Sequence, residues 1–172
     1  MSRKRNEYTG GANIMEIRQL KEEDAEQFLE LNKQLDDTGY MLYDPGERQM
    51  NVEEQRKAIA QMKAEPSTHF LVAIEGESLM GFIAVLRGKL KRNSHSAYLV
   101  LGVDKNYRGQ GVASALFEEV FSWSQIQGIS RLELTVIKHN HPAFNLYSKM
   151  GFILEGEKVR SLMIEGKPVN EY

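Results

Sequence analysis

Residues 98–114 decide the fold, and they read Tyr98-Leu-Val-Leu-Gly-Val-Asp-Lys-Asn-Tyr-Arg-Gly-Gln-Gly-Val-Ala-Ser114. The first six are apolar apart from one glycine, which predicts a buried strand. A turn with Gly109 and Gly111 follows, and a helix pattern begins directly after it. Glycines let a ligand approach the backbone closely, and the unpaired amides at a helix start favour phosphate. The stretch therefore predicts a pyrophosphate-binding turn, to which Arg108 and Lys105 add positive charge.

Two other phosphate-binding motifs do not fit this turn. The Gly-Lys-Ser/Thr of the P-loop is absent. The Rossmann pattern needs a third glycine where Ser114 stands, and its strand opens a βαβ unit instead of following a hairpin. A Gly-x-Gly pair alone also fits a plain connection from strand to helix. Both known motifs are therefore excluded, and the plain turn stays open.

The flanking segments alternate between strand and helix patterns in one α/β domain. A hairpin with its turn at 75–78 precedes the central strand, and a strand-helix-strand crossover follows it. Strands are expected at 14–18, 69–74, 79–86, 95–103, 131–137 and from 152 onward. Helices are expected over 22–35, 51–65, 111–127 and 142–149. Neither an internal repeat nor a domain linker interrupts this order.

The composition excludes several functional classes. The chain has 172 residues, enough for one domain, and a net charge of −2, which argues against coating nucleic acid or an anionic membrane. No apolar run approaches the roughly 20 residues of a membrane span. Cysteine is absent, which excludes disulfides and a cysteine nucleophile and indicates a cytoplasmic location. His139 and His141 have no nearby acid, so a solvated loop is favoured over a metal pair, and no metal is expected.

The N-terminal residues differ in pattern from the rest. Residues 1–13 are polar, with three basic side chains and Gly10-Gly11, and they lack the apolar run of a signal peptide. They are expected to form a flexible leader before a domain at 14–172.

Two landmarks resemble the GNAT family of N-acetyltransferases. Arg108-Gly-Gln-Gly-Val-Ala113 fits that family's Arg/Gln-x-x-Gly-x-Gly/Ala signature at every fixed position. Downstream, Asn140-His-Pro-Ala-Phe-Asn-Leu-Tyr-Ser-Lys-Met-Gly-Phe152 resembles its second landmark, Asn-x-x-Ala-x-x-Leu-Tyr followed by Gly-Phe. A helix and a strand separate the two, as in the family, and the resemblance extends over about 15–170.

The resemblance implies a fold and an acetyl-CoA site. The fold would be a twisted mixed sheet of about six to seven strands flanked by about four helices, with a splayed strand pair holding the cofactor. The turn and helix start would bind the pyrophosphate, the backbone of the preceding strand would pair with pantetheine, and the second landmark would add contacts. The implied cofactor-binding residues are Leu101, Val103, Arg108, Gly109, Gln110, Gly111, Val112, Ala113, Ser114, Asn140 and Lys149.

The implied activity is transfer of an acetyl group from acetyl-CoA to a primary amine of a small molecule or peptide. Direct attack in a ternary complex is expected, since no cysteine exists to carry the acetyl group. Tyr147 would stabilise or protonate the thiolate, although on its own a Leu-Tyr pair at a helix end also fits simple packing. Relatives often carry a Glu that acts as the general base on the strand before the glycine turn. In this chain Tyr98 occupies about that position, which leaves His95 and Glu133 as candidate bases.

Three further questions concern the acceptor, the assembly and the chemistry. In this family the loop after the first helix helps to select the acceptor, and its acids here would favour a cationic amine: Asp36, Asp37, Asp44 and Glu47. A charged solvated loop is the alternative. A very short last strand at 169–172 would leave a sheet edge open to a second copy, so a homodimer is expected. A catalytically silent acyl-CoA sensor and an interaction protein with an unused cleft are the alternative functions.

Overall fold

The computed structural model describes residues 7–9 and 14–172, which build a mixed α/β domain around one central sheet. The order of the sheet is β1-β2-β3-β4-β5-β6. Neighbours are antiparallel except for β5 and β6, which are parallel. The strands are β1 (Glu7–Thr9), β2 (Ile14–Gln19), β3 (Thr68–Glu75), β4 (Ser78–Arg87), β5 (Ser96–Val103) and β6 (Arg131–Glu133). A separate two-stranded sheet contains β7 (Lys158–Ile164) and β8 (Lys167–Glu171).

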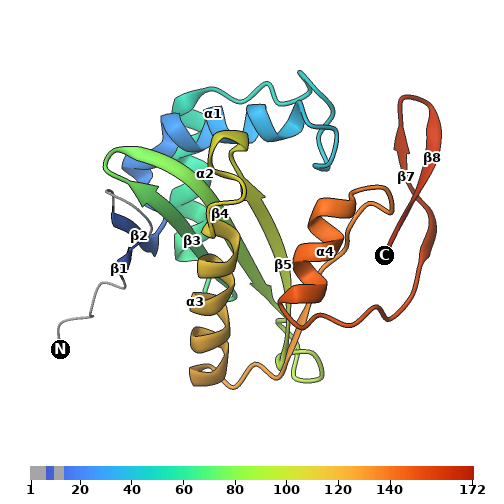
Figure 1. Ribbon diagram of the computed structural model, residues 1–172. Coiled ribbons are helices and arrows are strands. Elements are labelled where there is room, and N and C mark those ends of the chain that lie inside the picture. The colour runs from blue at the N-terminus through green and yellow to red at the C-terminus, as the bar shows by residue number, and fades with distance from the viewer. Residues whose placement is uncertain (1–6, 10–13) are drawn as a thin grey trace.

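In the described part of the chain, four α-helices pack around the central sheet. They are α1 (Ala25–Asp36), α2 (Val52–Ala64), α3 (Val112–Ile126) and α4 (His141–Lys149). The first two lie on one face of the sheet and α3 on the other, with α4 and the β7–β8 hairpin beside the β5–β6 end (Figure 1). Four helices around a mixed sheet confirm the predicted fold class.

Each face of the sheet has its own apolar cluster. On the α1 side, Phe28 packs edge-on against Phe70 and Phe82. On the α3 side, Phe117 and Leu116 pack against residues of β4 and β5. Because both faces are covered, β4 is buried over most of its length, as expected for a central strand.

Local sequence signals account for several element boundaries. The predicted capping box at the start of α2 is present: Glu54 N donates to Asn51 Oδ1 at 2.9 Å, and Asn51 N donates to Glu54 Oε2 at 2.8 Å. The predicted hairpin joins β3 to β4, with Gly76 at φ 60° in its turn.

Two predicted strands differ from the structure. The strand expected over 131–137 ends at Glu133, because the following residues leave β5 and meet the end of β8, where Val136 and Tyr172 exchange two backbone hydrogen bonds. The strand expected from Phe152 does not form. Gly151 turns the chain at φ 91°, and residues 153–157 pair with no strand in the described part of the chain, so β7 begins only at Lys158.

Part of the expected leader is described. Residues 7–9 form β1 and pair with β2, while residues 1–6 and 10–13 lie outside the described residues. The expected boundary at residue 14 therefore does not coincide with the edge of the sheet, because β1 extends the sheet beyond β2. In the described part of the chain, no helix is both long and apolar enough to cross a membrane.

Candidate functional site

The turn between β5 and α3 is held by its own polar contacts. Asp104 Oδ1 accepts from Asn106 N at 2.7 Å, and Gln110 Nε2 donates to Asn106 O at 2.9 Å. Gly109 and Gly111 adopt φ 74° and 85°, in the left-handed region that disfavours other residues. A Cβ at either glycine would meet nothing within 4 Å. The backbone, and not crowding, therefore requires glycine at both positions.

The first turn of α3 presents backbone amides at the end of this turn. Gly111 is the N-cap residue and has no side chain with which to cap the helix. The first intrahelical bond is donated by Ala115 N to Gly111 O at 3.0 Å, which leaves the amides of 112–114 without an intrahelical acceptor. The Val112 side chain is fully buried and anchors the helix end. The helix start is thus fixed in place with free N–H groups, an arrangement that favours anions.

Among the described residues, the strand that leads into the turn has no strand partner along part of one edge. β5 and β6 pair only over Ser96–Tyr98 and Arg131–Glu133 and then diverge. Asp104 N donates to Met80 O and Gly88 N to Ser96 O, so even-numbered residues of β5 direct their backbone groups at β4. Backbone direction alternates along a strand, and the N–H and C=O groups of Leu99, Leu101 and Val103 therefore face the splay.

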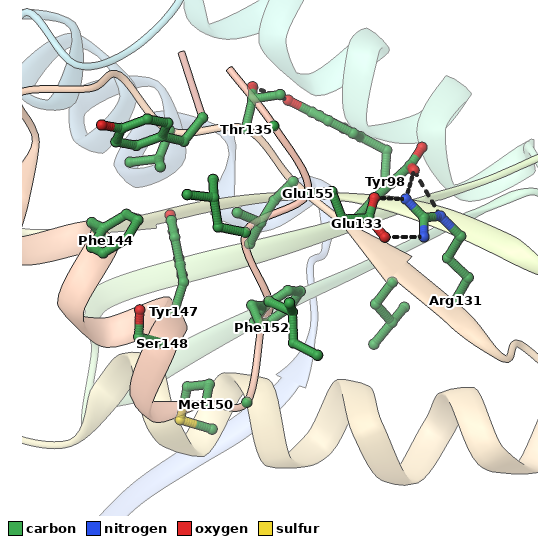
Figure 2. Close-up of a pocket in the computed structure, with 18 of the residues that line it drawn as sticks. Tyr98, Arg131, Glu133, Thr135, Phe144, Tyr147, Ser148, Met150, Phe152 and Glu155 are labelled. Atoms are coloured by element: carbon green, nitrogen blue, oxygen red, sulfur yellow. Dashed lines mark hydrogen bonds and ion pairs between the residues drawn. The ribbon is translucent and has the colours of Figure 1, made fainter. Parts of the chain in front are cut away.

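Tyr147 projects from α4 toward the end of this splay. Its ring packs edge-on against Phe117 and Phe152, at centroid distances of 6.0 and 6.1 Å. Burial, with a smaller contribution from the charge of Tyr98, raises the pKa of Tyr147 to about 12. Tyr147, Tyr98 and Thr135 line one cavity of ≈ 1030 Å³, with Tyr147 of α4 on one side and Tyr98 of β5 and Thr135, which follows β6, on the other (Figure 2). A protonated phenol therefore lines the same cavity as Tyr98, the last residue of β5 that pairs with β6.

A sequence comparison identifies the family. The profile described as "Acetyltransferase (GNAT) family" matches residues 18–152, most of the chain. The chain belongs to the GNAT acetyltransferase family.

Curated relatives of this GNAT chain include enzymes that acetylate nitrogen. The L-amino acid N-acetyltransferase of Escherichia coli is 32% identical over 111 residues, which cover 62% of this chain and 67% of that protein. The N-alpha-acetyltransferase of Mycobacterium tuberculosis is 30% identical over 105 residues, 60% of this chain and 63% of that protein.

Solved structures have the same fold. A GNAT family acetyltransferase from Streptococcus pneumoniae superposes with a TM-score of 0.83 at 28% identity, covering 92% of this chain and 96% of that one. An acetyltransferase from Salmonella typhimurium, solved with its cofactor acetyl-CoA, gives a TM-score of 0.78 at 14% identity, with 91% and 90% covered. The second likeness shows the fold alone. The family match supports acetyl-CoA use by the GNAT chain.

The remaining residues expected at the GNAT cofactor site lie at three places. Arg108 is exposed, and its Nε donates to Val103 O at 3.3 Å, which holds the guanidinium at the end of β5. Asn140 caps α4, because its Oδ1 accepts from Ala143 N at 3.3 Å. Lys149 is exposed at the opposite end of that helix, about 13 Å from Asn140 at 1.5 Å per residue. Arg108 thus joins the turn, whereas Asn140 and Lys149 cannot meet one small group together.

The two bases suggested by the sequence are poorly placed. Glu133 lines the cavity, but its carboxylate accepts from Arg131 Nε at 3.0 Å, and the same guanidinium binds Glu155 (Figure 2). His95 is exposed before β5, and its backbone carbonyl accepts from Ser130 and Arg131. Neither side chain offers an unpaired base in the splay.

A hydrogen-bonded set of three residues beside the splay is not predicted from the sequence. Thr135 Oγ1 lies 2.8 Å from Tyr98 Oη and 2.8 Å from Glu171 Oε1. These residues are more than thirty positions apart, and the strand expected over 131–137 gave Thr135 no special place. Only the folded chain brings the three together.

The loop between α1 and α2 lies against the far end of the splay. The rings of Tyr40 and His139 are 5.9 Å apart, which places this loop beside the segment that follows Thr135. Asp36 is buried and bonded to Arg48, so it is unavailable to an acceptor, contrary to expectation. Glu47 Oε2 accepts from Asp44 N at 2.9 Å. The expected acidic surface is therefore smaller than the sequence indicates.

Proposed function

We propose that this chain transfers the acetyl group of acetyl-CoA to a primary amine of a small molecule or peptide, by direct attack in a ternary complex. The supporting observation is one continuous feature: the free edge of β5 runs directly into the glycine turn and the amides of α3. From Tyr98 to Val103 this edge is about 16 Å long at 3.3 Å per residue. It would join an anion site at the turn to the cavity that Tyr147 lines.

The chain's own groups divide the binding between them. The N–H groups of Val112, Ala113 and Ser114 would donate hydrogen bonds to the pyrophosphate, and the backbone of the turn, Gly109, Gln110 and Gly111, and the Arg108 charge would add to this binding. The outward backbone groups of Leu101 and Val103 would pair with the amides of pantetheine as a neighbouring strand would. The cosubstrate supplies an activated thioester, and the protein supplies its position.

Tyr147 serves the proposed reaction best as a hydrogen-bond donor. Its pKa of about 12 keeps the phenol protonated at neutral pH, so it can always donate. Full transfer to a thiolate, whose conjugate acid has a pKa near 8.5, would be uphill by about 5 kcal/mol. Tyr147 would therefore stabilise charge on sulfur as the C–S bond breaks, and the thiol would take its proton from the acetylated amine or water. A backbone amide of the β5 edge near Leu101 would polarise the thioester carbonyl.

An α-amino group is the first acceptor to consider. The relatives from Escherichia coli and Mycobacterium tuberculosis are named for L-amino acids and for N-alpha-acetylation. In this chain, the acids that could attract a highly cationic polyamine are partly neutralised, since Asp36 is paired with Arg48.

We further propose that the protein lies in the cytoplasm and forms a homodimer. Light scattering after gel filtration tests the dimer.

Thiol release tests the proposed function. The purified protein is incubated with acetyl-CoA and each of the twenty L-amino acids, short peptides or spermidine, and free CoA is measured. Release above the acceptor-free rate, with an acetylated product in the mass spectrum, is the expected result. Acetyl-CoA binding without release on any amine would instead support an acyl-CoA sensor.

A further inference from the structure

Three side chains from separate segments form one hydrogen-bonded chain beside the splay. Tyr98 lies on β5, Thr135 follows β6, and Glu171 ends β8. Tyr98 Oη and Thr135 Oγ1 are 2.8 Å apart, and Thr135 Oγ1 and Glu171 Oε1 are 2.8 Å apart. The first of these contacts is visible in Figure 2 at the edge of the cavity. A continuous path therefore leads from the cavity to a carboxylate.

The chemistry of the three groups gives this path a direction. An ionised carboxylate can only accept hydrogen bonds, so Thr135 must donate its single hydroxyl proton to Glu171. Thr135 then has only lone pairs for Tyr98, and the phenol must be the donor of that contact. Among the described residues, no other hydrogen bond to Tyr98 Oη is found, so its oxygen can still accept. The path is thus set to receive a proton at Tyr98 and deliver it to Glu171.

The path borders the cavity at its Tyr98 end and reaches solvent at its Glu171 end. Tyr98 is the last residue of β5 that pairs with β6, and it lines the same cavity as Tyr147. At the other end, the Glu171 side chain keeps 12% of its surface exposed, which allows exchange with water. The nearest cation is Lys158, whose Nζ is 4.0 Å from Glu171 Oε2, while Lys138 is held by Glu157 and lies over the Tyr172 ring.

We propose that Tyr98, Thr135 and Glu171 form a proton relay that takes the proton from the amine acceptor, a proposal that rests on the acetyl transfer proposed above. The ammonium N–H donates to Tyr98 Oη, the Tyr98 proton moves to Thr135, and the Thr135 proton moves to Glu171. The amine is left neutral, both hydroxyls are restored, and Glu171 later releases the proton to water. The amine then forms its C–N bond as the C–S bond breaks, and its second proton leaves with the thiol.

This assignment gives the site the base that its central strand lacks. Tyr98 is the catalytic residue of the relay because it would touch the reacting nitrogen. Thr135 and Glu171 act through it and are relay residues. An amine must be neutral to attack, and general-base assistance contributes about 10²–10⁴-fold to such reactions.

The test compares Thr135→Val, Thr135→Ser and Glu171→Gln with the unaltered protein, using acetyl-CoA and the L-amino acid that releases thiol fastest. Valine has the shape of threonine without its hydroxyl, so Thr135→Val is expected to lower kcat/KM about 10²-fold. Serine keeps the hydroxyl and is expected to stay within about threefold. Glu171→Gln is expected to match the valine variant, and its defect is expected to shrink as the pH rises and the free amine becomes abundant.

Further readouts separate a relay from a structural role. The double variant Thr135→Val/Glu171→Gln is expected to be no slower than either single one, because both break the same path. The KM for acetyl-CoA and the Tm are expected to stay unchanged. Full activity of Thr135→Val, or multiplicative losses in the double variant, would overturn the relay while leaving acetyl transfer intact. A protein that acetylates no amine would instead refute the proposed function, and the relay with it.

Discussion

Arg48 donates two hydrogen bonds to Asp36, from Nε at 2.7 Å and from Nη2 at 3.1 Å, and so ties the loop before α2 to the last turn of α1. The Asp36 side chain is only 2% exposed, and the Arg48 guanidinium also lies 4.2 Å from the centre of the Tyr43 ring. This loop also carries Tyr40, whose ring lies beside that of His139. One ion pair thus fixes the surface expected to face the acceptor.

Replacing Arg48 with methionine is expected to destabilise the protein strongly. The variant leaves the Asp36 carboxylate buried without its partner, which costs about 3 kcal/mol in the free energy of unfolding. Urea denaturation measures this loss. Arg56→Met is the matched control, because the ion pair of Arg56 with Glu53 is exposed and is worth less than about 1 kcal/mol. Equal losses in the two variants would show that the buried pair does not hold the loop.

Alanine at Gly111 is expected to weaken acetyl-CoA binding. A side chain at φ 85° costs about 1–2 kcal/mol, which the turn can relieve by moving the first amides of α3. A rise of about tenfold in the Kd for acetyl-CoA follows if those amides bind the pyrophosphate. Gly128→Ala imposes similar strain at φ 69° beyond the other end of α3 and is expected to leave the Kd unchanged. Equal effects on the Kd would mean that strain alone, and not the site, is measured.

Phenylalanine at Tyr147 is expected to lower kcat by about 10²-fold, since it removes the hydrogen-bond donor proposed for the leaving sulfur. The affinity for acetyl-CoA and the free energy of unfolding are expected to change little, because the ring contacts with Phe117 and Phe152 remain. Steady-state kinetics and calorimetry give the two quantities. Tyr107→Phe, which alters a partly buried tyrosine next to the glycine turn, serves as the control. Full turnover of Tyr147→Phe would remove this phenol from the reaction.

The raised pKa of Tyr147 predicts a loss of stability in alkali. Below pH 10 the phenol is protonated in both the folded and the unfolded chain, and the full stability is present. Between pH 10 and 12 the unfolded chain loses this proton first, so unfolding becomes easier as the pH rises through the folded pKa of about 12. The expected loss is about 2–3 kcal/mol. Measuring unfolding of the unaltered protein and of Tyr147→Phe across this range isolates the effect, and identical pH dependences would contradict it.

Sequence reasoning located the turn because the signal there is local. Gly109 and Gly111 are required by the backbone, and the helix that follows has a clear apolar face, so neighbours in sequence predict the turn, whereas its assignment as a cofactor site depends on the resemblance to the GNAT family. The capping box of Asn51 and Glu54 was found for the same reason.

Features that depend on distant contacts were not predicted. The β5–β6 pairing stops at Tyr98 and Glu133, but the apolar pattern continues to Ile137, because that segment finds a second partner at Tyr172. The pairing of Asp36 with Arg48 was likewise invisible, since an acid in a loop sequence looks solvated until the fold buries it. Tertiary packing decides such contacts, and the local pattern of apolar residues carries no information about them.

A calorimetric titration of the protein with acetyl-CoA, repeated with Gly111→Ala and Gly128→Ala, tests the cofactor site most directly. One acetyl-CoA is expected to bind per chain of the unaltered protein and of Gly128→Ala, with clearly weaker binding for Gly111→Ala alone. No binding to the unaltered protein, or binding that Gly111→Ala leaves unchanged, would contradict a cofactor site at the start of α3.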